Sequence, residues 1–193
     1  MITDIYVNAM SKKIYEQNKS VGWWDNPDRC LFECLQLIST EIAEATEGCR
    51  KDLMDDHLPH RKMEEVELAD AAIRAMDLGG HLGLSFSERR ASHMWLSPPM
   101  ESKGKCHLAL NCLLIDFAKS LSAIEYLKKN STVSVFEIEE LEESYSSLLG
   151  DIFYYARNCG YDLVSAIEEK LDYNKNRADH KRENREKEGG KKF

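Results

Sequence analysis

Residues 28–51, DRCLFECLQLISTEIAEATEGCRK, decide the fold of this chain. Within them the apolar residues recur with the period of an α-helix, at Leu31, Leu35, Ile38, Ile42 and Ala45. Polar and charged residues fill the positions between them. A run of this length and pattern predicts a long amphipathic helix with one buried face.

The rest of the chain carries the same pattern. We expect further helices over residues 4–19, 60–82, 106–129, 137–159 and 163–180. A capping box at Ser134 and Glu137 marks the start of one of them, and a similar pair at Ser85 and Glu88 predicts an additional short helix. Only 4 Pro and 10 Gly occur in 193 residues. This turn-poor composition favours an all-α helical bundle over a β-sandwich.

Two stretches divide the chain into parts. The clearest linker is SPPMESKGK, residues 97–105, and the end of the chain, residues 181–193, is strongly charged and contains a Gly-Gly pair. We therefore expect one helical half over residues 1–96, a second over residues 106–180 that completes the bundle, and a mobile tail.

The two halves show a weak similarity, which leaves an internal duplication open. Both halves have the order helix, loop, helix, glycine and helix cap. If the duplication is real, four acidic positions of the first half, discussed below, correspond to Lys119, Ser122, Ser144 and Ser147. None of these residues is expected to hold Mg²⁺, so the second half would be a non-catalytic repeat and each chain would carry one site.

Composition excludes several classes of partner. The formal net charge of −8 argues against a nucleic-acid duplex, because binding its phosphates needs a basic surface. A free nucleotide is still compatible with this charge, since a divalent metal can bridge phosphates to carboxylates.

The six cysteines form no C-x-x-C pair, which favours reduced thiols in a cytoplasmic protein. No apolar run approaches the roughly 18 residues of a membrane span, and no secretion signal is evident.

Two pairs of carboxylates carry the chemistry. Glu41 and Glu44 lie at i and i+3 in the first long helix, and Glu67 and Asp70 repeat that spacing in the next one. Packed antiparallel, the two helices would bring all four carboxylates together, where their mutual repulsion is unfavourable unless a cation is present. Oxygen ligands without histidine or thiolate favour Mg²⁺, with Mn²⁺ as the other choice. A single E-x-x-E is more often a solvated acidic face.

The sequence resembles a known family at this point. E-x-x-E, then residues 45–66, then E-x-x-D is similar to the signature of the MazG-like all-α nucleotide pyrophosphohydrolases, which are related to the dimeric dUTPases. GWW at 22–24, ELADAAIR at 67–74 with Asp77, and EKLDYNKNR at 169–177 resemble the phage branch of that family. Together these stretches cover most of residues 20–83 and 150–180.

The resemblance implies an enzyme that hydrolyses a (deoxy)nucleoside triphosphate to the monophosphate and pyrophosphate, adjusting nucleotide pools. Glu41, Glu44, Glu67 and Asp70 would hold Mg²⁺, which would bridge the phosphates and acidify the attacking water. Glu44 is our choice for a general base. The family also implies a homo-oligomer, a dimer or a tetramer.

Further residues are candidates for substrate binding, each with a structural alternative. Arg74 would grip a phosphate, or else pair with Asp70 or Asp77. The stripe of Lys170, Asn174 and Arg177 suits phosphate and sugar, or else is a solvated helix face. The remaining candidates form an aromatic pair that would stack on a base or fill a hydrophobic gap, Trp23 and Trp24.

One departure and three alternatives stay open. The family's His-Gly-Gly-Lys-like ending is interrupted here, because a charged insertion separates His180 from residues 189–191. The substrate could instead be a guanosine alarmone or a modified nucleotide, or the chain could be a helical nucleotide-binding protein without turnover. A di-iron carboxylate bundle is disfavoured, because the sequence contains no E-x-x-H motif. Base and sugar preference depend on pocket shape and are not readable from the sequence.

Overall fold

The computed structural model describes residues 3–91, 102–175 and 177. These ranges contain helices and no strand, apart from one isolated bridge between Met54 and Lys62. The predicted all-α class is therefore confirmed. In chain order the helices are α1 Asp4–Ser20, α2 Leu31–Lys51, α3 Met63–Leu82, α4 Lys103–Asn130, α5 Val135–Asn158 and α6 Leu163–Lys175.

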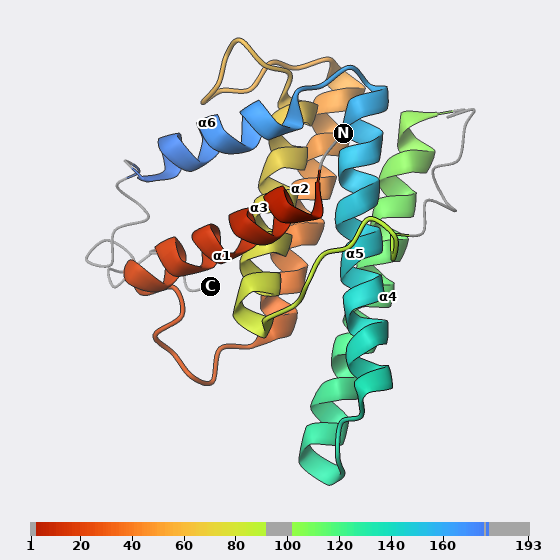
Figure 1. Cartoon of the computed structure of the whole chain (residues 1–193). Helices are drawn as coiled ribbons and strands as arrows, with labels where there is room; N and C mark the ends of the chain where they lie inside the picture. Colours follow the sequence, from red (N-terminus) through yellow and green to blue (C-terminus); the bar gives the residue numbers. More distant parts are fainter. Residues whose placement is uncertain (1–2, 92–101, 176, 178–193) are drawn as a thin grey trace.

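Four helices form a bundle and two lie across it. Helices α2, α3, α4 and α5 run side by side, while α1 and α6 cross the bundle on the side of α3 (Figure 1). The distal end of the α4–α5 hairpin extends beyond the other helices (Figure 1). Helix α3 packs against α1, α2, α5 and α6, so it is buried on nearly every side.

Small residues let the neighbours of α3 come close. A Cβ added at Gly79 would lie 2.5 Å from the Tyr145 ring of α5, and one at Gly80 would lie 2.6 Å from the carbonyl oxygen of Ser11 in α1. The hydroxyls of Ser11 and Tyr145 then hydrogen-bond to each other at 3.0 Å within the core. Helix α3 is thereby fixed between α1 and α5 at both glycines.

The helix ends follow their local sequence in most places. The predicted capping box is confirmed at the start of α5, where the Ser134 amide donates to the Glu137 carboxylate at 2.9 Å. Helix α3 ends at Gly83, which adopts a left-handed φ of 70°. The short helix predicted after Ser85 is wrong. The Glu88 amide donates to Asp4 of α1 at 2.9 Å, so it is not available to a Ser85 cap.

The last residues of the predicted linker belong to a helix. Ser102 caps α4 by accepting a hydrogen bond from the Lys105 amide, so the helix begins at Lys103, inside the range 97–105. Residues 97–101 lie outside the described residues, as do the predicted tail and the last residues of the helix expected over 163–180, which is described to Lys175.

Helix α4 has an apolar outer face. Leu108, Ile115 and Tyr126 are each more than half exposed there. Among the described residues, α4 is the one helix that is long and apolar enough to cross a membrane by length and composition. The core helix of a soluble protein passes the same test, and 44% of the most apolar window of α4 is buried within the molecule.

Burial does not support the expected register between the two halves. Ile38 and Glu41 are buried on α2, whereas the residues aligned with them, Asp116 and Lys119, are exposed on α4. Helices α3 and α5 do agree in phase, for example at Met76 and Phe153. The halves thus share a hairpin architecture, and duplication stays a prediction.

Candidate metal centre

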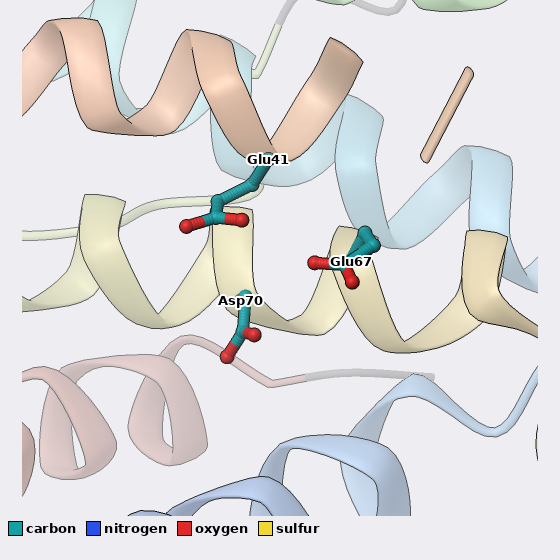
Figure 2. Close-up of side chains that lie close together, drawn as sticks. All are labelled: Glu41, Glu67 and Asp70. Atoms are coloured by element: carbon teal, nitrogen blue, oxygen red, sulfur yellow. The ribbon is translucent and has the colours of Figure 1, made fainter. Parts of the chain in front are cut away.

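Three carboxylates meet between α2 and α3. Glu41 comes from α2, Glu67 and Asp70 come from α3, and one oxygen of each lies within 4.8 Å of the others (Figure 2). Glu41 is 5% exposed because it falls on the apolar face of α2, and Glu67 is 7% exposed because α3 is buried all round. The predicted convergence of the two helices is therefore present for three of the four carboxylates.

Glu44 is not part of this group. It lies exposed on α2, one turn beyond Glu41. Its charge is nevertheless close enough to contribute to the raised pKa of Glu67. Glu44 is thus at the edge of the site, where a substrate or water can reach it without disturbing the core.

Two cations already lie against the cluster. The Lys170 ammonium, on α6, is 2.9 Å from Asp70 Oδ2, and Lys170 is only 2% exposed. Arg74 donates from Nε to Glu41 Oε1. Arg74 therefore pairs across to α2, and not with Asp70 or Asp77 as the structural alternative from sequence had it. No described residue forms a hydrogen bond or an ion pair with Glu67.

The electrostatics single out Glu67. The pKa of Glu67 is raised to about 8. The largest cause is burial, and the nearby charges of Asp70, Glu41 and Glu44 raise it further, whereas Lys170 lowers it. Burial likewise raises the pKa of Asp70, although Lys170 opposes the shift. Without an added cation, Glu67 is thus held with a proton near neutral pH.

The other residues of the predicted substrate stripe lie on or just after α6. The Asn174 Oδ1 atom, one turn after Lys170, is buried with no hydrogen-bond partner among the described residues. The Arg177 guanidinium lies 5.8 Å from the centre of the Tyr173 ring. The structure thus places Lys170 at the acidic cluster and Asn174 one turn further along the same helix.

Of the two tryptophans, Trp24 packs against the C-terminal end of α3. The Trp24 ring stacks on His81 with centroids 3.9 Å apart, and its Nε1 donates to Asp77 Oδ1 at 3.0 Å. The Arg29 guanidinium lies 4.4 Å from the Trp24 ring and donates to the Trp23 carbonyl. These contacts give Trp24 the structural role of a plug, and stacking on a base stays a prediction.

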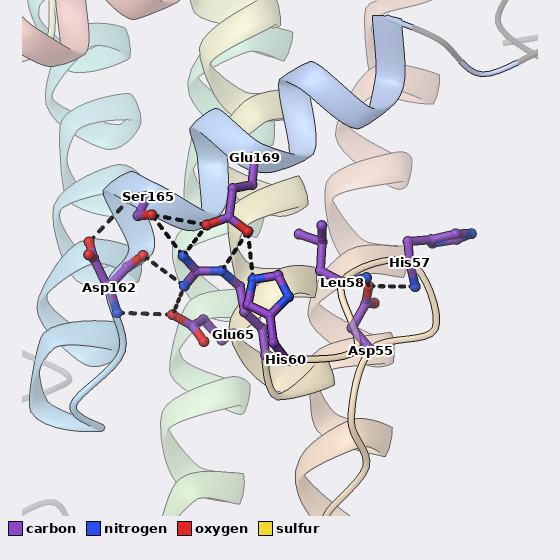
Figure 3. A network of polar contacts seen from close by, with 9 residues as sticks. Asp55, His57, Leu58, His60, Glu65, Asp162, Ser165 and Glu169 are labelled. Carbon is purple, nitrogen blue, oxygen red and sulfur yellow. Dashed lines mark hydrogen bonds and ion pairs between the residues drawn. The ribbon is translucent and has the colours of Figure 1, made fainter.

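A polar network, which the sequence did not reveal, holds α6 in place (Figure 3). Arg61, in the loop before α3, binds Glu169 and Glu65 at 2.7 Å each, and His60 reaches Glu169 at 2.8 Å. Glu169 immediately precedes Lys170. The network therefore fixes the turn of α6 that brings Lys170 to Asp70. The i, i+4 spacing of Arg61 and Glu65 was its one signal in the sequence.

Asp55 shapes the same loop from within. It is 4% exposed, and its Oδ1 accepts the amides of His57 at 2.9 Å and Leu58 at 2.7 Å (Figure 3). Its charge also helps to raise the pKa of Lys170, against the effect of burial. Lys170 thus has Asp55 as well as Glu67 nearby, besides its ion-pair partner Asp70.

A second buried glutamate, Glu64, lies one turn before Glu67. It accepts hydrogen bonds from Tyr155 at 2.6 Å and His107 at 3.1 Å, and also from Lys103 and Tyr161. Burial alone would raise the pKa of Glu64, but these donors outweigh it and hold the pKa well below its usual range. Glu64 is a structural anion that ties α3 to α4 and α5.

Comparisons with known proteins add no identification. No family model, no curated protein and no solved structure matches this chain.

Proposed function

We propose that this chain is a nucleotide pyrophosphohydrolase that depends on a divalent metal ion. The observation that carries the proposal is the group of Glu41, Glu67 and Asp70, whose oxygens lie within 4.8 Å of one another in a buried position. Lys170 and Arg74 supply two positive charges against three carboxylates. The third carboxylate, Glu67, has no cation of its own and holds a proton instead.

The ligand set fits a hard cation. The three side chains offer oxygen only, which suits Mg²⁺ or Mn²⁺ better than Zn²⁺. The high proton affinity of Glu67 fits as well, because a cation at this place would replace the proton. When bound, the metal would supply positive charge for phosphate oxygens and acidity for a water molecule.

The chain's own residues have distinct tasks in this proposal. Glu44, exposed at the rim, accepts the proton of the attacking water. Arg74 has a side chain that is 36% exposed, so it can leave Glu41 and bind a phosphate of the substrate. Lys170 is buried and keeps Asp70 oriented. Asn174 offers an amide toward the substrate, and the products are the nucleoside monophosphate and pyrophosphate.

A competing proposal is a helical protein that binds a nucleotide without turning it over. It is favoured by the same ion pairs, since Lys170 and Arg74 neutralise two carboxylates without any metal. Glu67 favours the enzyme, because binding phosphate alone has no need for a third buried carboxyl group that lacks a cation.

The test is the release of pyrophosphate from the eight common NTPs and dNTPs, with Mg²⁺ and with EDTA. We expect turnover that requires the metal and falls by a factor on the order of 10³ in Asp70→Asn and Glu44→Ala. Glu47→Gln is the matched control, because Glu47 lies on α2 one turn beyond Glu44 and pairs only with Arg50 and Lys51 among the described residues.

The outcomes separate the proposals. Full turnover in both site variants would remove the assignment of the metal centre. Metal-dependent binding without turnover of any of the eight nucleotides would point to an alarmone or a modified nucleotide as substrate, and these are assayed next. Absence of turnover on those as well would establish the binding protein.

A further inference from the structure

A cavity of about 340 Å³ lies between the loop after α3, the C-terminal half of α5 and the start of α6. It shares no lining residue with the acidic cluster. Four of its ten lining residues are aromatic, Phe86, Phe153, Tyr154 and Tyr161. Among these, the two phenylalanines are buried and the two tyrosines half-buried.

One wall of this cavity is held by an unusual set of hydrogen bonds. Four consecutive backbone amides of the loop after α3 each donate to a side chain from another part of the chain. The pairs are Ser85 with Glu142, Phe86 with Asn8, Ser87 with Ser146, and Glu88 with Asp4, at 2.8 to 3.1 Å. Asn8 also donates to the Phe86 carbonyl at 3.0 Å. An irregular loop fixed in this way is a rigid wall.

The opposite wall is equally fixed. The Asp162 amide at the start of α6 donates to Glu65 at 2.9 Å, and Arg61 reaches the Asp162 carbonyl at 3.5 Å. Asp162, together with Leu163 and Val164, closes the cavity on this side. Both walls are therefore in place before any ligand arrives, as is usual for small-molecule sites.

We propose that this cavity binds a planar nitrogen heterocycle the size of a nucleobase or nucleoside. The aromatic walls offer stacking surfaces for a flat ring. At the cavity's edge, the Arg157 guanidinium supplies donors for ring nitrogen or carbonyl groups. Glu88 and Asp162 supply acceptors for ring or exocyclic N–H groups.

The charges at the cavity disfavour a second triphosphate site. Two carboxylates, Glu88 and Asp162, stand against the single guanidinium of Arg157, so a highly charged anion is repelled. The ligand is therefore a neutral base or nucleoside. The proposal is independent of catalysis at the acidic cluster, since its evidence comes from a different part of the molecule.

The experiment is ligand-observed NMR and titration calorimetry with the four common ribonucleosides, carried out in EDTA so that the metal centre plays no part. We expect at least one nucleoside to bind. Val164→Trp, which fills the cavity from its half-buried wall, should weaken that binding at least tenfold. Val135→Trp is the matched control, because Val135 lies 71% exposed at the start of α5.

A second variant guards against a folding defect in the first. Arg157→Ala removes an exposed side chain and should weaken binding several-fold while leaving the helical circular dichroism unchanged. Binding that is lost in Val164→Trp and kept in Val135→Trp and in Glu67→Gln supports the cavity. If none of the four nucleosides binds the folded protein, the proposal is overturned. Binding that survives both cavity variants, or that disappears in Glu67→Gln, overturns it as well.

Discussion

Glu64 and Glu67 are neighbours one turn apart on α3, and they differ in almost everything except burial. They are 2% and 7% exposed. Glu64 accepts hydrogen bonds from four side chains on α4, on α5 and just beyond it, and they hold its pKa well below the usual range. Glu67 faces other carboxylates, and its pKa is raised to about 8, first by burial and then by those charges.

The difference shows what this fold does with a buried carboxylate. At Glu64 the donors come from α4, with Lys103 and His107, from Tyr155 on α5, and from Tyr161 beyond it. The same bundle gives Glu67 no donor among the described residues. A charge that the protein leaves uncompensated in its interior is costly, and such groups concentrate at functional sites. Glu67 is therefore the residue that we assign to an external cation.

Replacing each glutamate should separate the two roles by the largest margin. Glu64→Ala leaves four donors without their acceptor and should lower the free energy of unfolding by about 4 kcal/mol. Glu67→Gln removes a repelled charge and should leave the metal-free protein as stable as the wild type, or more so. Urea unfolding in EDTA at the pH where Glu67 is ionised checks both. Equal losses in the two variants would contradict the comparison.

The pH dependence of stability should sharpen the same contrast. The folded-state pKa of Glu67 lies above its ordinary value of 4.5, so the folded protein holds a proton that the unfolded chain releases. Stability is therefore full below that ordinary value and falls as the pH rises toward about 8. Between about pH 6 and pH 8 we expect the metal-free protein to lose roughly 2 kcal/mol.

The matched comparison for this slope is Glu67→Gln. Burial also raises the pKa of Asp77, to about 6, but that shift acts mainly below this pH window. The difference between wild type and Glu67→Gln, measured by urea unfolding at several pH values, therefore isolates Glu67. A wild-type slope identical to that of the variant would show that Glu67 does not hold the proton.

Magnesium should reverse the loss at high pH. A ligand that binds only the folded state at ten times its Kd raises the free energy of unfolding by about 1.4 kcal/mol. We expect a rise of this size in millimolar Mg²⁺ for the wild type and for Glu47→Gln, and none for Glu67→Gln. The measurement is the thermal unfolding midpoint with and without the ion. A rise that persists in Glu67→Gln would place the ion elsewhere.

The smallest effect is expected at the edge of the Glu64 network. Lys103 has a side chain that is 47% exposed, so solvent screens much of its attraction to Glu64, and three other donors remain. Lys103→Met should therefore cost only about 1 kcal/mol by urea unfolding. A loss as large as that of Glu64→Ala would mean that Lys103 alone neutralises the carboxylate.

Local signals in the sequence predicted the parts of the fold that depend on local structure. The helical spacing of apolar residues predicted α2 and α3. The i, i+3 spacing of the acidic residues correctly predicted that Glu41, Glu67 and Asp70 lie close together. Glu44 illustrates the limit of that spacing. Residues three apart differ in direction around the helix, so Glu41 faces α3 while Glu44 turns toward solvent.

Long-range contacts decided what the sequence did not reveal. The capping pair at Ser85 and Glu88 has the right residues, but acceptors on α1 and α5 bind their amides instead. The partners of Glu64 lie 39 to 97 positions away, and no local pattern announces them. Similarly, nothing near Lys170 indicates that it would be buried against Asp70, 100 positions earlier in the chain.

The position of Lys170 on the last helix has a consequence for the order of events during protein synthesis. Helices α2 and α3 are complete by Leu82, so Glu41, Glu67 and Asp70 can meet while α6 has yet to be translated. At ~5–20 residues per second, Lys170 follows on the order of 10 seconds later. During that interval the α2–α3 hairpin contains Arg74, but Lys170 has not yet been synthesised. If the proposed metal binds here, this interval lets it reach the three carboxylates before Lys170 arrives.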